Sequence, residues 1–405
     1  MKAFTFGKGR MRVKLRALLI FLLIFAVLFA AIPPAVSASA GSEADEEALA
    51  ELEESIEELI DSLDLEELQA YLDSLAQFEG VSLKDKLMSV VTGDFALDYS
   101  SLAQSLAGLI WDEAQMLFPA FAVILAIAVL CGILNSVKNG FLDSSMTEIV
   151  NFVGYLSIGA IVLACLLTVL KAGFSALESM RMQMELVFPL LLTLMAGSGG
   201  TVSAAVYRPA VAFLSGALVE LFTAIVLPSA LVIIVLSFVG KLSDEVRTER
   251  LGELFKSVNK WLIGISLTLF SLFLTVQGIT SATYDGISLR AAKYAITNSV
   301  PIVGGFLSGG VDLVLAGSAL IKNALGSFSI FMLVGTLFRP LVLFVVFHLF
   351  LRLAAAATEP IGGKISSFLS ALAGDFNYFT AGLLAVSFLY FITVLLLVCS
   401  SGVMF

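Results

Sequence analysis

The chain has 405 residues, of which 59% are apolar and 14% charged, whereas an average soluble domain has about 45–50% apolar and about 25% charged residues. The formal net charge is −10, and fifteen of the 33 acidic residues lie between Glu43 and Glu79. This composition excludes an ordinary soluble enzyme and a basic nucleic-acid-binding surface. Long uncharged apolar stretches after residue 116 instead predict an all-α polytopic membrane protein.

The first forty residues have the order of a secretory signal peptide. Six basic residues between Lys2 and Arg16 precede an apolar segment, residues 17–32, which two prolines end. Ala38 and Ala40 frame an A-x-A cleavage site. The alternative is an uncleaved membrane anchor. Both interpretations place residue 41 outside the cytoplasm, in agreement with the absence of Lys and Arg between Arg16 and Lys84.

Residues 41–116 are predicted to form a short, acidic, helical extracytoplasmic domain. Apolar residues recur with helical spacing from Leu52 to Leu75, and the opposite face is mostly carboxylate. Because like charges four residues apart oppose helix formation, the apolar stripe must pack against another element. A second amphipathic stretch, from Leu83 to Ile110, is one such element. The acidic face is either a docking surface for a partner or a solvated helix face.

Residues 117–405 are predicted to form a multi-span membrane domain. Four segments are long and apolar enough to cross a bilayer, namely residues 117–134, 149–170, 261–280 and 379–398. Between them lie two blocks rich in Pro and Gly, residues 186–240 and 300–352. We expect broken or re-entrant helices in these blocks, with breaks at Pro189, Pro228, Pro301, Pro340, Gly309 and Gly310.

The two blocks resemble each other. In each block two prolines lie 39 positions apart, and the paired prolines of the two blocks are offset by 112 residues. A glycine pair follows the first proline in both. We interpret this as an internal duplication of residues 149–260 and 261–378. Chance similarity between apolar sequences is the alternative.

The basic residues predict the topology. Five of them lie between Lys241 and Lys260, which indicates a cytoplasmic segment. If the chain starts outside, crosses at each span and crosses once in each block, residues 352–375 are inside and the C-terminus is outside.

Charged residues in apolar segments are candidates for a polar pathway, because a charge at the bilayer centre costs about 2.5–3.5 kcal/mol and usually faces a bundle interior or cavity. Glu220 and Asp312, which each follow the letters FLSG, are the first choices. Lys322, Arg339 and Arg352 are further candidates, although the two arginines are also placed to reach the membrane surface. For Glu220 and Asp312 the alternative is a structural pair with a neighbouring basic group or an interfacial position. The one histidine, His348, is either a proton relay or a packing residue.

The sequence contains no HExxH, GxSxG or P-loop motif, and one histidine cannot form a histidine-based metal site. Cys131, Cys165 and Cys399 lie in or at the end of predicted spans and have no metal-ligand spacing. We therefore expect no enzymatic activity, metal or cofactor. Any nucleotide hydrolysis would come from another subunit.

Two runs in the second half of the chain resemble the stage III sporulation protein AE family. They are VQGITSATYDGISLRAAKYAITNSVPIVGG, residues 276–305, and GTLFRPLVLFVVFHLFLRLAAAATEPIG, residues 335–362. The signal peptide, the acidic segment, the spans and the length fit this family, so the resemblance covers nearly the whole chain. It implies a protein of endospore-forming bacteria, located in the mother-cell membrane that surrounds the engulfed forespore.

The resemblance also implies partners and a function. The partners are other proteins of the stage III sporulation A operon, including an ATPase and ring-forming subunits, and stage II sporulation protein Q across the intermembrane space. The implied assembly is a secretion-like or feeding channel needed for forespore development after engulfment, and no catalytic residue is implied. The alternatives are a stand-alone secondary transporter of a small solute and a membrane scaffold without a pathway.

Overall fold

The computed structural model describes residues 54–75, 80–92, 99–141, 144–242, 248–299, 304–359 and 363–400. Within these ranges the regular structure is entirely helical. Six helices in the described part of the chain are long and apolar enough to cross a membrane. The predicted class, an all-α polytopic membrane protein, is confirmed.

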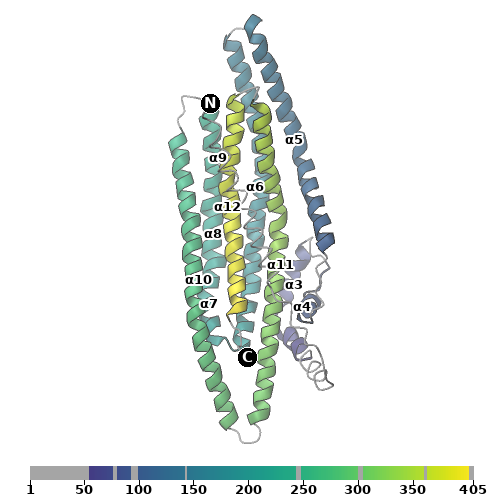
Figure 1. Ribbon diagram of the computed structural model, residues 1–405, viewed down its shortest axis with the longest axis vertical. Coiled ribbons are helices and arrows are strands. Elements are labelled where there is room, and N and C mark those ends of the chain that lie inside the picture. The colour runs from purple at the N-terminus through teal and green to yellow at the C-terminus, as the bar shows by residue number, and fades with distance from the viewer. Residues whose placement is uncertain are drawn as a thin grey trace, which may run out of the picture.

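The long helices lie side by side and run alternately in opposite directions along the longest axis of the molecule (Figure 1). They are α5 (Tyr99–Phe141), α6 (Ser144–Gly197), a helix composed of α7 (Thr201–Phe213), η1 (Leu214–Leu218), α8 (Val219–Leu221), η2 (Phe222–Val226) and α9 (Leu227–Leu242), then α10 (Glu249–Ser299), α11 (Gly304–Thr358) and α12 (Gly363–Cys399). The segments η1 and η2 are π-helical. This alternation is the one that the predicted topology requires.

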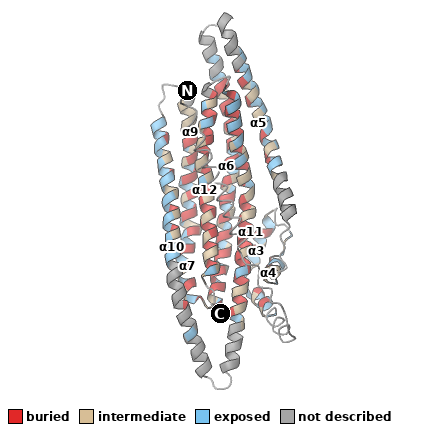
Figure 2. Cartoon of the chain, in the orientation of Figure 1, coloured by how far each residue is buried: buried red, intermediate tan, exposed pale blue. Residues whose placement is uncertain are grey.

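The core is formed where α6, α11 and α12 pack together, and buried residues concentrate there in Figure 2. Aromatic rings fill the contact between α11 and α12, where the ring centroid of Phe376 lies 5.2 Å from those of both Phe344 and Phe347. Further along the bundle, Tyr155 of α6 lies against Phe238 and Phe368, and its hydroxyl donates to the Phe238 carbonyl at 3.0 Å. Edge-to-face and stacked rings add to the apolar burial, so these contacts connect α6, α9 and α12.

The chain reverses direction between α6 and α7 at residues 198–200, inside the first predicted block. Gly199 has a φ of 90°, a conformation that residues with side chains rarely adopt. The Gly200 N–H donates to the Met195 carbonyl at 2.9 Å, which satisfies one of the last carbonyls of α6. The described break in the first block therefore lies at this glycine-rich segment.

The helices continue through the prolines at which we expected breaks. Pro189 lies inside α6, Pro228 inside α9 and Pro340 inside α11. Each of these prolines lacks the N–H that would donate to the carbonyl four residues earlier, and membrane helices tolerate this where neighbouring groups or a local change of the turn accommodate the freed carbonyl. The wide turn of η2 directly precedes Pro228, where the proline ring would otherwise clash with the preceding turn.

From Gly304 onward the second block is one continuous helix. Gly309 and Gly310 lie inside the continuous helix α11, and Pro301 lies outside the described residues. The first block contains a reversal, whereas the described part of the second block is a single helix, so the glycine pairs of the two blocks have different structures. The re-entrant hairpin expected in the second block is therefore wrong.

The predicted boundary between residues 116 and 117 falls inside α5, which runs without interruption from Tyr99 to Phe141. The stretch that we assigned to the outer domain, from Leu102 to Ile110, thus belongs to the same helix as the first predicted span. Residues 1–53, which include the predicted signal peptide and cleavage site, lie outside the described residues.

The acidic segment forms a small helical module, described over residues 54–75 and 80–92, beside α6 and α11 (Figure 1). Residues 54–62 are helical and are followed by α3 (Glu66–Ser74) and α4 (Leu83–Val91). The apolar stripe of the module is buried, including Ile56, Leu72 and Leu87. It packs both within the module and on the bundle, as the sequence required.

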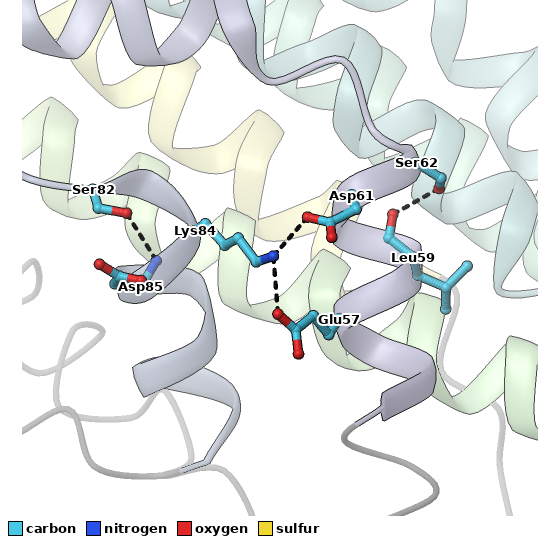
Figure 3. Close-up of polar contacts among 7 residues, drawn as sticks. All are labelled: Glu57, Leu59, Asp61, Ser62, Ser82, Lys84 and Asp85. Atoms are coloured by element: carbon cyan, nitrogen blue, oxygen red, sulfur yellow. Dashed lines mark hydrogen bonds and ion pairs between the residues drawn. The ribbon is translucent and has the colours of Figure 1, made fainter.

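The opposite face of the module carries exposed charges. Figure 3 shows the Lys84 ammonium between the carboxylates of Asp61 and Glu57, at 2.7 and 3.0 Å. The hydrogen bonds to Asp61 and Glu57 raise the pKa of Lys84. Because all three side chains are largely exposed, this contact fixes the approach of α4 to residues 54–62 more than it stabilises the fold.

A substitution at Gly173 tests the tight packing of α6 against α11 and α12. A Cβ at this position would lie 2.5 Å from Cε1 of Phe379 and 2.7 Å from Cζ of Phe344. We expect Gly173→Ala to lower the stability by about 1–3 kcal/mol, because rigid rings must move. The matched control is Gly264→Ala in α10, where a Cβ meets nothing within 4 Å. Thermal unfolding in detergent measures the stability of both variants. A melting temperature of Gly173→Ala equal to or above that of the wild-type protein would contradict this packing.

Candidate polar pathway and its surroundings

Glu220 lies on α8, a single short turn between the π-helical segments η1 and η2. Its side chain is 62% exposed, and its Oε2 lies 3.8 Å from Nη1 of Arg181 on α6. The Arg181 Nε donates to Glu185 Oε1 at 3.0 Å. Glu178 and Lys171 are also exposed on α6. We call Lys171, Glu178, Arg181, Glu185 and Glu220 the charged face.

The structure does not join the other predicted site residues to Glu220. The Arg339 Nε donates to Glu113 Oε1 at 3.0 Å, which connects α11 to α5. The Arg352 Nε donates to His348 Nε2 at 2.7 Å, one turn earlier on α11. Lys322 is 1% exposed in the interior.

Asp312, the other first choice, lies on α11, and its side chain is outside the described residues. Among the described residues, no group of three His, Cys, Asp or Glu side chains is arranged to hold a metal ion.

Asp285 of α10 has a role that the sequence did not indicate. Its carboxylate accepts from the Val202 N–H at 2.8 Å and from the Ser203 N–H at 3.1 Å. These are the amides that the side chain of an N-cap residue normally satisfies. The N-cap of α7 is Gly200, which has no side chain. Asp285 therefore caps α7 from a neighbouring helix, and its charge also suits the positive end of the helix dipole.

A second buried carboxylate, Asp375 of α12, connects three helices. Its Oδ1 lies 2.6 Å from Nζ of Lys256 on α10, and its Oδ2 accepts from the Ser237 hydroxyl on α9. Asn259 on α10 donates to the Val226 carbonyl at 3.2 Å. These contacts fix α10 along the whole length of α7–α9.

The acidic module is joined to the bundle through buried polar groups. The Tyr71 hydroxyl donates to the Ser179 carbonyl at 3.1 Å. Gln183 on α6 is fully buried and donates to Thr336 Oγ1 at 2.6 Å and to Tyr71 Oη at 3.3 Å. The module thus has a defined position against α6 and α11.

The comparisons with known proteins agree with the resemblance of residues 276–305 and 335–362. The family model described as stage III sporulation protein AE matches residues 81–401. The chain belongs to the stage III sporulation protein AE family. Stage III sporulation protein AE of Bacillus subtilis (strain 168) is 25% identical over 346 residues, which cover 84% of this chain and 87% of that protein. No solved structure matches the chain.

The two runs that resemble the family contain several of the residues whose contacts are described above. Residues 276–305 contain Asp285, and residues 335–362 contain Thr336 and Arg339. The match begins at residue 81, so it includes α4 and every long helix but not α3. As a member of this family, the chain is a sporulation protein, and its described residues include six helices long and apolar enough to cross a membrane.

Removing the cap of α7 should weaken the α7–α10 contact. We expect Asp285→Ala to cost about 1–3 kcal/mol, because two buried amides lose their acceptor. Asp285→Asn keeps one acceptor oxygen and should lose less. Hydrogen exchange at residues 201–206 reports the cap locally, and thermal unfolding reports its total effect. Unchanged exchange in Asp285→Ala would show that other groups satisfy these amides.

Proposed function

We propose that this chain is a membrane subunit of a channel complex between the mother cell and the forespore, needed for forespore development after engulfment. The observation that carries the proposal is the family match over residues 81–401.

The secondary-transporter alternative drew its support from broken helices at matching positions of two halves. The second of these helices, α11, is continuous from Gly304 to Thr358. Because the described parts of the two blocks do not both contain a broken helix, the structure gives no support for a solute site between two repeats.

The proposal places the chain in the mother-cell membrane around the forespore, with the signal peptide removed and residues 54–92 in the intermembrane space. The partners would be other stage III sporulation A-operon proteins, including an ATPase and ring-forming subunits, and stage II sporulation protein Q. The module supports this placement, because its bundle-facing side is apolar and its other side carries exposed carboxylates such as Glu57 and Asp61. Nucleotide hydrolysis would come from the ATPase subunit.

A clean deletion in the native host tests the proposal. We expect sporulation to arrest after engulfment, with a small or collapsing forespore, and complementation with the intact gene to restore spores. Microscopy through sporulation provides the measurement. Normal spores from the deletion strain would overturn the proposed function.

Single substitutions separate a conduit from a scaffold. Glu220→Gln and Asp312→Asn each remove one charge with little change in size. If the chain is part of a conduit, cells complemented with either variant should assemble the complex normally but fail in forespore development. If the chain is a scaffold, both assembly and development should stay normal. The matched control is Glu253→Gln on α10, an exposed carboxylate outside the charged face.

A further inference from the structure

Helix α10 lies at the edge of the bundle and contacts the rest of the chain along one side (Figure 1). On that side Asn259 and Phe270 are buried, and the Lys256 Nζ lies 2.6 Å from Oδ1 of Asp375 on α12. The opposite side of α10 is exposed between residues 249 and 272. No described residue of this chain covers that side, so its composition indicates what surrounds it in the assembled protein.

An apolar stripe follows the exposed side of α10. It consists of seven large apolar side chains that are each 42–67% exposed, namely Leu251, Leu254, Val258, Trp261, Ile265, Leu269 and Leu272. The six steps from residue 251 to residue 272 average 3.5 residues, which is the apolar period of helices that pair in coiled coils. At about 100° per residue, the seven side chains lie within an arc of about 80°. We call these seven residues the α10 stripe.

The residues beside the stripe change character along the helix. The charged side chains of Glu249, Arg250, Glu253 and Lys260 are exposed on the first half of α10, whereas no charged residue occurs from residue 261 to residue 276. On the same projection, the four charged residues lie on one flank, outside the arc of the stripe. The stripe keeps its spacing across this change of surroundings.

Neither lipid nor water alone accounts for the whole stripe. Lipid suits the second half, but it does not suit the first half, where Glu253 and Lys260 are exposed beside Leu254 and Val258. Water suits these charges, but it leaves a row of large apolar side chains exposed. A second helix packed on the stripe accounts for both halves, because it buries the apolar arc and leaves the charged flank open.

A second copy of this chain is the partner that fits the stripe best. Copies inserted in one membrane have the same orientation, so two α10 helices can pair in parallel around a two-fold axis. Parallel pairing places each stripe residue beside its counterpart. The two stripes therefore match over their full length, which is about 32 Å at 1.5 Å per residue. The contact is apolar throughout, and the charged residues stay on its flanks.

We propose that the α10 stripe joins two copies of this chain as a parallel helix pair. The narrow arc of the stripe fits one facing helix, and therefore a dimer. The chain then enters any larger assembly in pairs. This inference does not rest on the proposed function, because a conduit, a transporter and a scaffold each admit such pairs.

Disulfide crosslinking in the full-length chain tests the pairing. In a background in which serine replaces all three cysteines, a single cysteine replaces Val258 or Ile265 of the stripe. The matched controls are Glu253→Cys and Gly264→Cys, which lie on the exposed flank, one in each half of the stripe's length. Two copies with different tags are expressed together, and their membranes are oxidised with copper phenanthroline. One tag is then captured and the other is detected.

We expect Val258→Cys and Ile265→Cys to form at least about fivefold more disulfide-linked dimer than the controls, because a disulfide requires two Cα atoms within about 7 Å. The product should carry both tags and have twice the mass of the monomer. Labelling after denaturation confirms that each thiol is present. Two stripe positions guard against one variant that fails to fold.

Four results would overturn the inference. Monomers at both stripe positions, with thiols that react after denaturation, would mean that lipid covers the stripe. A crosslinked product with one tag and a different mass would mean that another protein covers it. Equal dimer formation at stripe and control positions would indicate random collision, and a dimer at only one stripe position would contradict a continuous helix pair.

Discussion

A backbone in lipid must satisfy its own hydrogen bonds, and the architecture of this protein follows from that requirement. The longest helices, α6 and α11, contain 54 and 55 residues and continue through Pro189 and Pro340. The described reversal at residues 198–200 leaves few amides without a partner, because Gly200 donates back to α6 and Asp285 accepts from the start of α7. At the reversal, the Asp285 carboxylate and the Gly200 N–H thus form hydrogen bonds with backbone groups that the ends of α7 and α6 would otherwise leave without a partner.

Polar groups are placed where they connect elements, and the apolar contacts fill the rest. Asp285 and Asp375 hold α10 against its neighbours, and Gln183 connects the acidic module to α6 and α11. Removing one member of such a buried pair costs more than the pair itself contributes, since the remaining group has lost its partner. The charged face differs from these pairs, because its side chains are mostly exposed.

Composition and hydropathy were sufficient to predict the helical membrane class and the approximate positions of the spans, because a bilayer fixes helix length and polarity. They did not predict that helices pass through Pro228 and Pro340, since tolerance of proline depends on neighbouring groups that sequence order does not reveal. The cap formed by Asp285 joins residues more than eighty positions apart, so no local pattern indicated it. Glu220 was found because it interrupts an apolar run. Its neighbours Arg181 and Glu185 were not singled out, because they fall between the predicted span 149–170 and the block 186–240, and only the structure shows that α6 is continuous through them.

We propose that this chain contributes to a passage between the mother cell and the forespore. The most direct measurement follows a small hydrophilic fluorescent dye, loaded into the mother cell after engulfment, in wild-type and deletion strains. A passage that needs this chain predicts dye in the wild-type forespore and its absence from the forespore of the deletion strain while that forespore is still intact. Equal entry in both strains, or no entry in either, would contradict the account.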